Sequence, residues 1–266
     1  MSLLHVRASA IGYDASRPVL RDVALCVAPG EAVALLGGNG AGKTALLRFI
    51  AGLLPAADGV CEIAGQRVRS PQQAVAAGVG LLVQDPDDQL LGTTLEQDTA
   101  LGPRNLGCSP AEIANRVTEA LETIELQALR AREISSLSLG EKKRAALAGV
   151  LAMQPQLLLL DEPSAGLDPQ AERAVCQAMV AQRERGRTLL VATHAVDLVP
   201  YFATRVLVLA EGRVLADGTC REILIQGELL TRARVRMPWP AELWQRTHAN
   251  SSQPTPLTLE ELLPQL

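Results

Sequence analysis

The stretch GGNGAGKT, residues 37–44, decides the fold class of this sequence. It follows the apolar run AVALL (residues 32–36), precedes the helix-like run ALLRFIAGL (residues 45–53) and matches the pattern G-x-x-x-x-G-K-[ST]. Glycines let successive backbone N–H groups curl around phosphate oxygens, Lys43 reaches the β- and γ-phosphates, and the Thr44 hydroxyl binds Mg²⁺. The order strand, loop and helix favours a phosphate-binding loop over a plain Gly-rich turn. The expected binding residues are Gly37, Gly38, Asn39, Gly40, Ala41, Gly42, Lys43 and Thr44.

A second motif, LLLLDE at residues 157–162, is an apolar strand that ends in two carboxylates. In a P-loop enzyme, Asp161 would hold the Mg²⁺ shell, and Glu162 would orient or deprotonate the attacking water. Taken alone, such a pair usually means only that a buried strand has reached solvent. Together with residues 37–44, it indicates nucleotide hydrolysis.

Short apolar runs recur along the chain and predict an α/β fold with a mostly parallel sheet. They lie at residues 23–27, 32–37, 79–83, 157–160, 188–193 and 206–209, and helices are expected at 110–129, 138–153 and 170–185. The first 31 residues are instead typical of antiparallel strands. Residues 206–218 predict a hairpin that turns at Glu211 and Gly212.

Residues 84–136 interrupt the alternation of strands and helices and predict a helical insertion. We therefore expect a main domain over residues 1–228, with a helical subdomain at about 85–152, and a C-terminal extension over 229–266. In the extension, Trp239 and Trp244 could pack the tail onto the main domain or form a subunit contact, and packing is the favoured interpretation. A polar linker, NSSQPTP (residues 250–256), precedes a short helix that Thr258 and Glu261 would open as a capping box, unless the tail is frayed.

Composition excludes several classes of function. The net charge is -4 and there is no long basic tract, so a broad nucleic-acid-binding face is disfavoured. Five scattered cysteines favour reduced thiols packed as small hydrophobes, and His5, His194 and His248 are too dispersed for a metal site. The N-terminus lacks a secretory signal pattern, and no run reaches the roughly 18 apolar residues of a membrane span. A membrane role would therefore require a partner.

With these motifs in order, residues 3–225 resemble the ATP-binding subunit of an ABC transporter, an α/β P-loop NTPase. The resemblance implies that Tyr13 stacks on adenine, Gln84 is the Q-loop glutamine, LSLGE (residues 137–141) is the family signature, Asp168 is the D-loop aspartate and His194 is the switch histidine. It implies catalysis by Glu162, His194 and Gln84, and Mg²⁺ binding by Thr44, Gln84 and Asp161. It also implies a head-to-tail dimer, in which Ser138 and Gly140 of one subunit face the ATP that the other holds.

The signature departs from the family sequence LSGGQ, because Leu139 replaces a glycine and Glu141 replaces a glutamine. A carboxylate close to a triphosphate is repulsive where water is scarce. However, Ser138 to Glu141 also matches the capping-box pattern S-x-x-E, in which Glu141 bonds the Ser138 backbone N–H. Our hypothesis is that Glu141 serves this cap and not the nucleotide.

Residues 81–107 resemble the Q-loop and following helix of energy-coupling-factor ATPases, which power vitamin, cobalt or nickel uptake. This resemblance implies that residues 85–98 contact a transmembrane coupling subunit, whereas the alternative is an ordinary acidic surface loop. LSLGEKKRAALAGVLAM, residues 137–153, is closest to the cobalt or nickel members. A separate membrane protein would bind the substrate, and this chain would be a peripheral protein at the cytoplasmic face of the membrane.

Two other functions compete with this interpretation. One is a soluble ABC ATPase of translation or DNA repair, although those proteins usually carry two cassettes or a long coiled coil, and this chain has one P-loop and no sustained heptads. The other is a weakly catalytic subunit that binds ATP and forms the structural half of a heterodimer. The presence of Glu162 and His194 counts against it.

Overall fold

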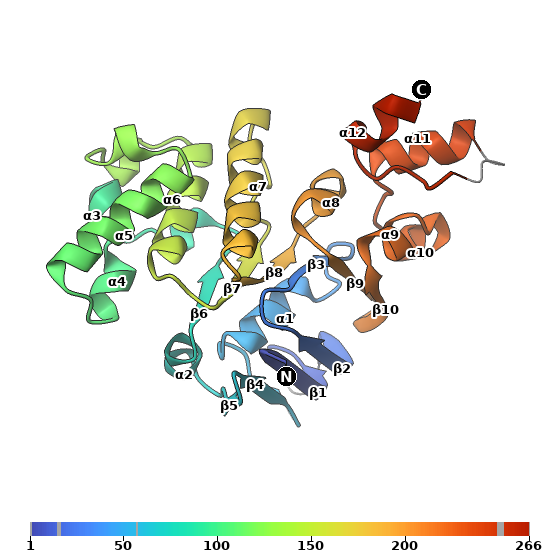
Figure 1. Cartoon of the computed structure of the whole chain (residues 1–266). Coiled ribbons are helices and arrows are strands. Elements are labelled where there is room, and N and C mark those ends of the chain that lie inside the picture. The colour runs from blue at the N-terminus through green and yellow to red at the C-terminus, as the bar shows by residue number, and fades with distance from the viewer. Residues whose placement is uncertain (1, 15–16, 57, 249–252, 266) are drawn as a thin grey trace.

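The computed structural model describes residues 2–14, 17–56, 58–248 and 253–265, and its centre is a six-stranded sheet (Figure 1). The strand order is β10-β9-β3-β8-β7-β6. All neighbouring pairs are parallel except β9 and β10. The strands are β3 (Ala32–Leu36), β6 (Val79–Leu82), β7 (Leu157–Asp161), β8 (Thr188–Ala192), β9 (Arg205–Ala210) and β10 (Arg213–Thr219).

The apolar runs explain this sheet, because β3, β7 and β8 are buried at every residue. The expected α/β fold with a mostly parallel sheet is confirmed. The hairpin of β9 and β10 is also confirmed: Glu211 and Gly212 both have positive φ, 52° and 71°, as a two-residue type I′ turn requires.

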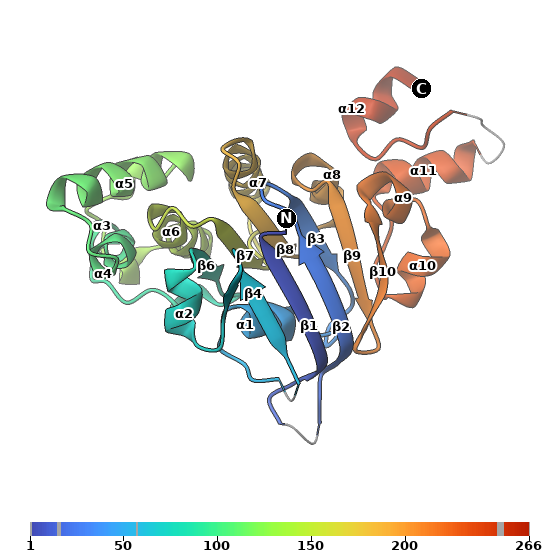
Figure 2. The same cartoon turned by 60° about the horizontal axis from the view of Figure 1, so that its bottom comes forward.

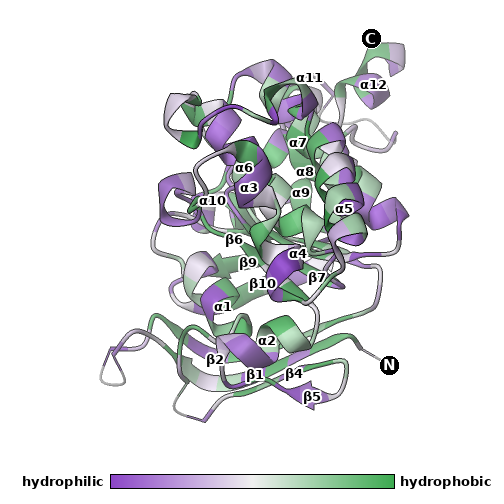
Figure 3. Ribbon diagram, turned by 90° about the vertical axis from the view of Figure 1, so that its left-hand side faces the viewer, coloured by the Kyte–Doolittle hydropathy of each residue, from purple (hydrophilic) through white to green (hydrophobic). Residues whose placement is uncertain are grey.

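A second sheet contains the antiparallel strands expected at the N-terminus, in the order β2-β1-β4-β5. Its strands are β1 (Leu4–Ile11), β2 (Leu20–Val27), β4 (Val60–Ile63) and β5 (Gln66–Arg67). Figure 3 shows helix α1 (Lys43–Ile50) between the two sheets, and the buried side chains of α1, β1, β2 and the central strands form one hydrophobic core. The P-loop is thus held between two sheets.

The helices of the insertion lie beyond the β6 edge of the main sheet (Figures 1 and 2). Here α5 ends six residues before the predicted residue 129, because Glu125 has a φ of 57° and only a 3-10 turn follows. The helices from residue 71 to 202 are α2 (Pro71–Ala76), α3 (Leu95–Thr99), α4 (Leu101–Asn105), α5 (Pro110–Thr123), α6 (Leu139–Ala152), α7 (Pro169–Glu184) and α8 (Val199–Phe202).

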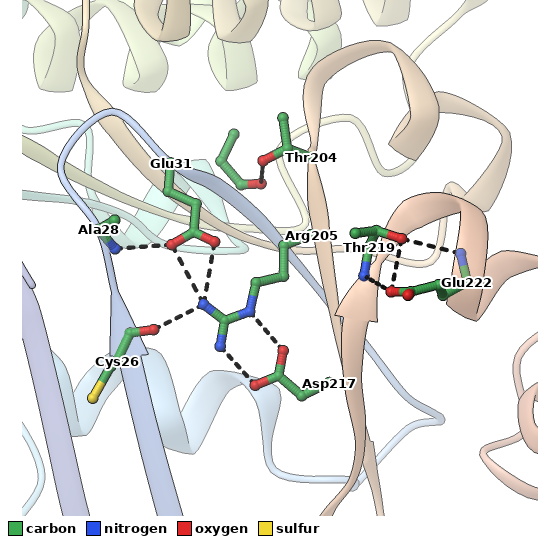
Figure 4. Close-up of polar contacts among 9 residues, drawn as sticks. Cys26, Ala28, Glu31, Thr204, Arg205, Asp217, Thr219 and Glu222 are labelled. Carbon is green, nitrogen blue, oxygen red and sulfur yellow. Dashed lines mark hydrogen bonds and ion pairs between the residues drawn. The ribbon is translucent and has the colours of Figure 1, made fainter.

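Arg205 joins the two sheets near the other edge (Figure 4). Its guanidinium donates two 2.6 Å hydrogen bonds to Asp217 on β10, and also bonds Glu31 and the Cys26 carbonyl, at 3.2 and 2.9 Å. A bidentate arginine fixes both distance and orientation. Strands β2, β9 and β10 are therefore held together at one point.

The C-terminal helices lie beyond β10, at the opposite end of the main sheet from the insertion (Figures 1 and 2). They are α9 (Cys220–Leu224), α10 (Gly227–Arg232), α11 (Trp239–Thr247) and α12 (Leu259–Leu262). Trp244 is buried and stacks on His248, whereas Trp239 is 59% exposed. Trp244 is thus buried beside a residue of the extension itself, and the exposed Trp239 does not follow the packing interpretation.

Three smaller expectations have mixed outcomes. The Thr258 hydroxyl caps α12 as predicted. The capping box is incomplete, because the Glu261 carboxylate accepts the N–H of Leu257 instead of that of Thr258 and forms an ion pair with Arg221. Residues 249–252, in and next to the predicted linker, lie outside the described residues. Cysteines 61, 176 and 220 are buried, but Cys26 is exposed, so packing as a small hydrophobe is wrong for it.

None of the helices within the described part of the chain is both long enough and apolar enough to cross a membrane.

Candidate nucleotide-binding site

The loop between β3 and α1 adopts a conformation that its glycines make possible. Gly42 has a φ of 104°, and a Cβ there would lie 2.5 Å from Leu20 on β2. Helix α1 begins at Lys43 without a side-chain cap, so its first N–H groups are not satisfied by a neighbouring side chain. Unpaired N–H groups at a helix N-terminus attract phosphate.

A cleft of about 640 Å³ opens over this loop. It brings together predicted site residues from five separate segments of the chain. Its lining contains Tyr13, the loop residues Gly38 to Thr44, Gln84, Asp161, Glu162 and His194. Strands β3, β7 and β8 are neighbours and parallel, so the segments at their carboxyl ends meet at one edge.

Lys43, Glu162 and His194 form a cluster at the centre of the cleft. The Lys43 ammonium donates to the Gly37 carbonyl at 2.8 Å and lies 3.0 Å from His194 Nε2 and 3.7 Å from Glu162 Oε1. Burial lowers the pKa of Lys43, and the charges of Glu162 and Asp161 partly oppose that shift. The lysine is thus a buried basic group in contact with the loop backbone, Glu162 and His194.

Glu162 is held in a strained backbone conformation. Its φ is 50°, unusual for a residue with a side chain, and its N–H donates to the Ala192 carbonyl at 2.9 Å. Oε2 accepts the His194 N–H at 3.1 Å, whereas Oε1 is buried without a hydrogen-bond partner. His194 Nε2 lies 3.2 Å and the Lys43 ammonium 3.7 Å from this second oxygen, so Oε1 lies beside two basic groups without a hydrogen bond.

Asp161 offers a carboxylate oxygen that could be a ligand of a divalent cation. Its Oδ1 is buried and has no hydrogen-bond partner. Burial raises the pKa of Asp161, and the Thr44 hydroxyl and Lys43 oppose that rise. A second cavity of about 400 Å³ is lined by Thr44, Gln84 and Asp161, among others. Mg²⁺ typically takes one or two protein ligands and completes its shell with water and phosphate, so these residues fit it.

The described residues contain no group of three or more histidine, cysteine or acidic side chains that could hold a metal ion, and among Thr44, Gln84 and Asp161 only Asp161 is acidic. The site therefore offers a cation few protein oxygens, and a bound triphosphate would supply others.

Tyr13 lies at the mouth of the cleft. The residue is 60% exposed, the Arg48 guanidinium lies 5.9 Å from the ring centroid, and Arg48 donates to the Tyr13 hydroxyl at 3.2 Å. An exposed aromatic face next to a phosphate loop suits stacking on a base.

Ser138, Gly140 and Asp168 lie outside the cleft lining. Ser138 and Glu141 form the predicted capping box: the Ser138 N–H donates to Glu141 at 2.7 Å, and the Ser138 hydroxyl accepts the Glu141 N–H at 3.3 Å. Asp168 caps α7 by accepting the N–H groups of Gln170 and Ala171, each at 2.9 Å. The structure of one chain thus divides the predicted residues between a cleft and a separate surface.

Sequence reasoning missed two residues that shape the site. Lys143 lines the second cavity and donates to the Ala165 carbonyl, which joins helix α6 to the loop after β7. Arg48 orients Tyr13. The basic run 142–144 was visible in the sequence, but only packing of α6 shows which of its side chains turns inward.

Comparison with known proteins identifies the family. The profile of the ABC transporter family matches residues 20–165. The energy-coupling factor transporter ATP-binding protein EcfA of Methanothermobacter thermautotrophicus is 38% identical over 263 residues, which is 97% of this chain and 85% of that protein. EcfA of Methanocaldococcus jannaschii is 38% identical over 87% of this chain and 84% of that protein.

Among solved structures, cbiO1 of Clostridium perfringens, described as part of the ABC transporter complex cbiONQ, has a TM-score of 0.76 and 32% identity. The match covers 92% of this chain and 99% of that one. The chain therefore belongs to the ABC transporter family, as an ATP-binding subunit of the energy-coupling-factor type.

Proposed function

We propose that this ATPase subunit hydrolyses ATP with Glu162 as the group that activates water. The observation that carries the proposal is the Glu162 carboxylate, buried beside Lys43 and His194, with one oxygen free of hydrogen bonds. A carboxylate that keeps an acceptor in a phosphate cleft can orient a water molecule or take its proton.

In this mechanism the loop N–H groups and Lys43 bind the β- and γ-phosphates, and Tyr13 stacks on adenine. Asp161, Thr44 and Gln84 would hold Mg²⁺, which neutralises phosphate charge when it is bound. His194, fixed by its N–H bond to Glu162, would hold the γ-phosphate in position. Lys43 would exchange its present bonds to the Gly37 carbonyl and His194 for phosphate oxygens.

We further propose that two subunits close head to tail over two ATP molecules. Ser138 and Gly140 are directed outward at the start of α6, and Leu139 between them is 55% exposed. Asp168 lies in the adjacent loop, close to this surface, and the nearest side chain to Gly140 is Leu167. An exposed helix N-terminus beside the cleft is available to the nucleotide of a second subunit.

We also propose a division of the chain into one domain, its subdomain and an extension. Residues 1–228 form the ATPase domain, residues 85–152 form its helical subdomain, and residues 229–266 form an extension. Residues 85–98 would contact a transmembrane coupling subunit, since Asp85 and Asp88 line the cavity that also contains Gln84. A change at the γ-phosphate would then be transmitted through Gln84 to residues 85–98 and from them to the membrane protein.

The substitution Glu162→Gln tests the hydrolytic proposal. Turnover should fall by about 10²-fold or more, because the amide cannot accept the proton, while ATP binding persists and a closed dimer accumulates. Turnover would be measured by phosphate release, binding by calorimetry, and dimer by light scattering. Glu184→Gln, at the exposed end of α7, is the control and should change none of these. Unchanged hydrolysis in Glu162→Gln would disprove the role of Glu162.

We propose that the complex imports cobalt or nickel ions, with the chain on the cytoplasmic face of the membrane. The support is the resemblance of residues 137–153 to cobalt and nickel members. Tagged protein would be purified from its own membranes in mild detergent, and its partners identified by mass spectrometry. A coupling subunit and a small membrane protein that binds cobalt or nickel are expected. A membrane protein that binds another substrate would change the cargo, and only ribosomal or DNA-associated partners would contradict transport.

A further inference from the structure

Residues 233–239, which run from the end of α10 to the first residue of α11, contact the P-loop and the turn that follows His194. On one side, the Ala233 carbonyl accepts the Gly38 N–H at 2.8 Å. Arg234, which has a φ of 57°, packs closely on the same loop. A Cβ added at Gly38 would lie 3.0 Å from the Cβ of Arg234. The backbone of the P-loop is therefore held by a residue that follows it by almost 200 positions in the chain.

On the other side, the same segment holds the turn after the switch histidine. Asp197 lies in the 3-10 helix Val196–Leu198, and its Oδ1 accepts the Trp239 N–H at 2.6 Å. Its two carboxylate oxygens also accept hydrogen bonds from the two terminal guanidinium nitrogens of Arg236, one each. The bidentate pair and the backbone bond fix this turn by three hydrogen bonds.

The turn is connected to His194 without a flexible spacer. The Val196 N–H donates to the His194 carbonyl at 2.9 Å, and the Leu198 N–H donates to the Ala195 carbonyl at 3.0 Å. A displacement of Asp197 is therefore transmitted to the backbone of His194, whose imidazole lies 3.0 Å from the Lys43 ammonium.

We propose that residues 233–239 are a clamp that positions the P-loop and the His194 turn relative to each other, with Asp197 as the positioning residue. The proposal rests on the proposed ATPase function. Phosphate binding requires Lys43 to leave His194, so the two clamped segments must adjust together. By thermodynamic reciprocity, nucleotide binding then changes the environment of the C-terminal extension, and the extension changes nucleotide affinity.

The chain carries a natural reporter of this coupling. It has two tryptophans, Trp239 and Trp244, and both lie on helix α11 of the extension. The N–H of Trp239 is itself bonded to Asp197. Intrinsic tryptophan emission therefore reports only on the extension, outside the cleft lining. A purely structural tether would leave this emission unchanged when nucleotide binds.

The experiment titrates full-length Glu162→Gln with ATP and Mg²⁺ and follows tryptophan emission, while calorimetry measures binding independently. A Trp244→Phe version isolates Trp239. We expect an emission change that saturates over the same ATP concentrations as the calorimetric binding. Binding without an emission change would overturn the clamp and leave the ATPase proposal standing. Absence of binding would overturn both.

Two variants and a matched control test the residues. Asp197→Asn and Arg236→Gln, each in the wild-type background, should raise the KM for ATP by about 5-fold or more with a smaller change in kcat, and should remove most of the emission response. Arg221→Gln is the control, because the Arg221–Glu261 pair also anchors the extension and is similarly exposed, but it touches neither motif. If the Asp197→Asn and Arg236→Gln proteins matched Arg221→Gln in KM and emission, the clamp would be excluded.

Discussion

Two helices of this chain begin at sequences expected to face phosphate, but their first turns differ. Helix α1 follows Gly42, which has a φ of 104° and provides no side-chain cap, and Lys43 in its first turn is buried. Helix α6 follows Ser138, which forms a capping box with Glu141, and Leu139 in its first turn is 55% exposed. The first N-terminus lies inside a cleft and lacks a side-chain cap, whereas the second is satisfied by its own side chains and faces outward.

In the proposed head-to-tail dimer, this difference would let one chain supply two different parts of a shared site. The N–H groups of α1 lie where glycine allows close approach, so they can bind phosphate within the subunit. The capping box bonds two backbone N–H groups at the start of α6, so in the proposed dimer this helix would be stable before the second subunit binds. The following predictions test this contrast from the larger effect to the smaller.

Gly42→Ala should have the largest effect. The new Cβ would lie 2.5 Å from Leu20 at a φ that side chains rarely adopt, so urea denaturation should show a loss of about 3 kcal/mol and ATP binding should fail. Gly40→Ala is the matched control: its φ is also positive, 76°, but a Cβ would meet no atom within 4 Å. Equal losses for the two variants would show that backbone strain alone, and not the contact with β2, demands glycine at position 42.

Lys43→Ala should weaken ATP binding by about 10²-fold, because it removes the buried cation that faces the phosphates. Calorimetry measures the loss. Lys142→Ala provides the control, since that lysine lies on α6 and pairs with Asp87 at 2.6 Å, away from the main cleft. Equal affinities of the Lys43→Ala and Lys142→Ala proteins would contradict the assignment of Lys43 to phosphate.

Ser138→Ala should cost about 1 kcal/mol of stability through loss of the cap, and should also lower turnover. Ser109→Ala is the matched control, because Ser109 forms the same kind of capping box with Glu112 at the start of α5. The control should lose a similar amount of stability by chemical denaturation but keep its turnover. If both variants turned over ATP equally well, Ser138 would have only a structural role.

Glu141→Gln should have the smallest effect, with turnover changed less than about twofold and stability by at most about 0.5 kcal/mol at neutral pH. The Ser138 backbone N–H lowers the pKa of Glu141 below its ordinary value of 4.5. Its contribution is therefore present above pH 4.5 and lost as the pH falls through its folded-state pKa, and the variant should lack this part of the acid dependence. A many-fold rise in turnover would instead show that the charge opposes nucleotide closure.

Much of this architecture could be predicted from local pattern. Fully apolar runs predicted β3, β7 and β8, and Ser138 with Glu141 predicted the cap of α6. Predictions failed where distant contacts compete with local ones. Glu261 completes no capping box, because Arg221 and the Leu257 N–H bind its carboxylate, and Trp239 is exposed although Trp244 is buried.

The sequence by itself determined the P-loop, the acid pair at the end of β7 and the family, because these signals depend on residue type and short spacing. Only the tertiary structure decided that Lys43, Glu162 and His194 converge, since that requires three strands to become neighbours in a sheet. It also decided that Ala233 and Arg236 reach the P-loop and the His194 turn. Such contacts leave no periodic pattern in a sequence, because each joins single residues that are far apart in the chain.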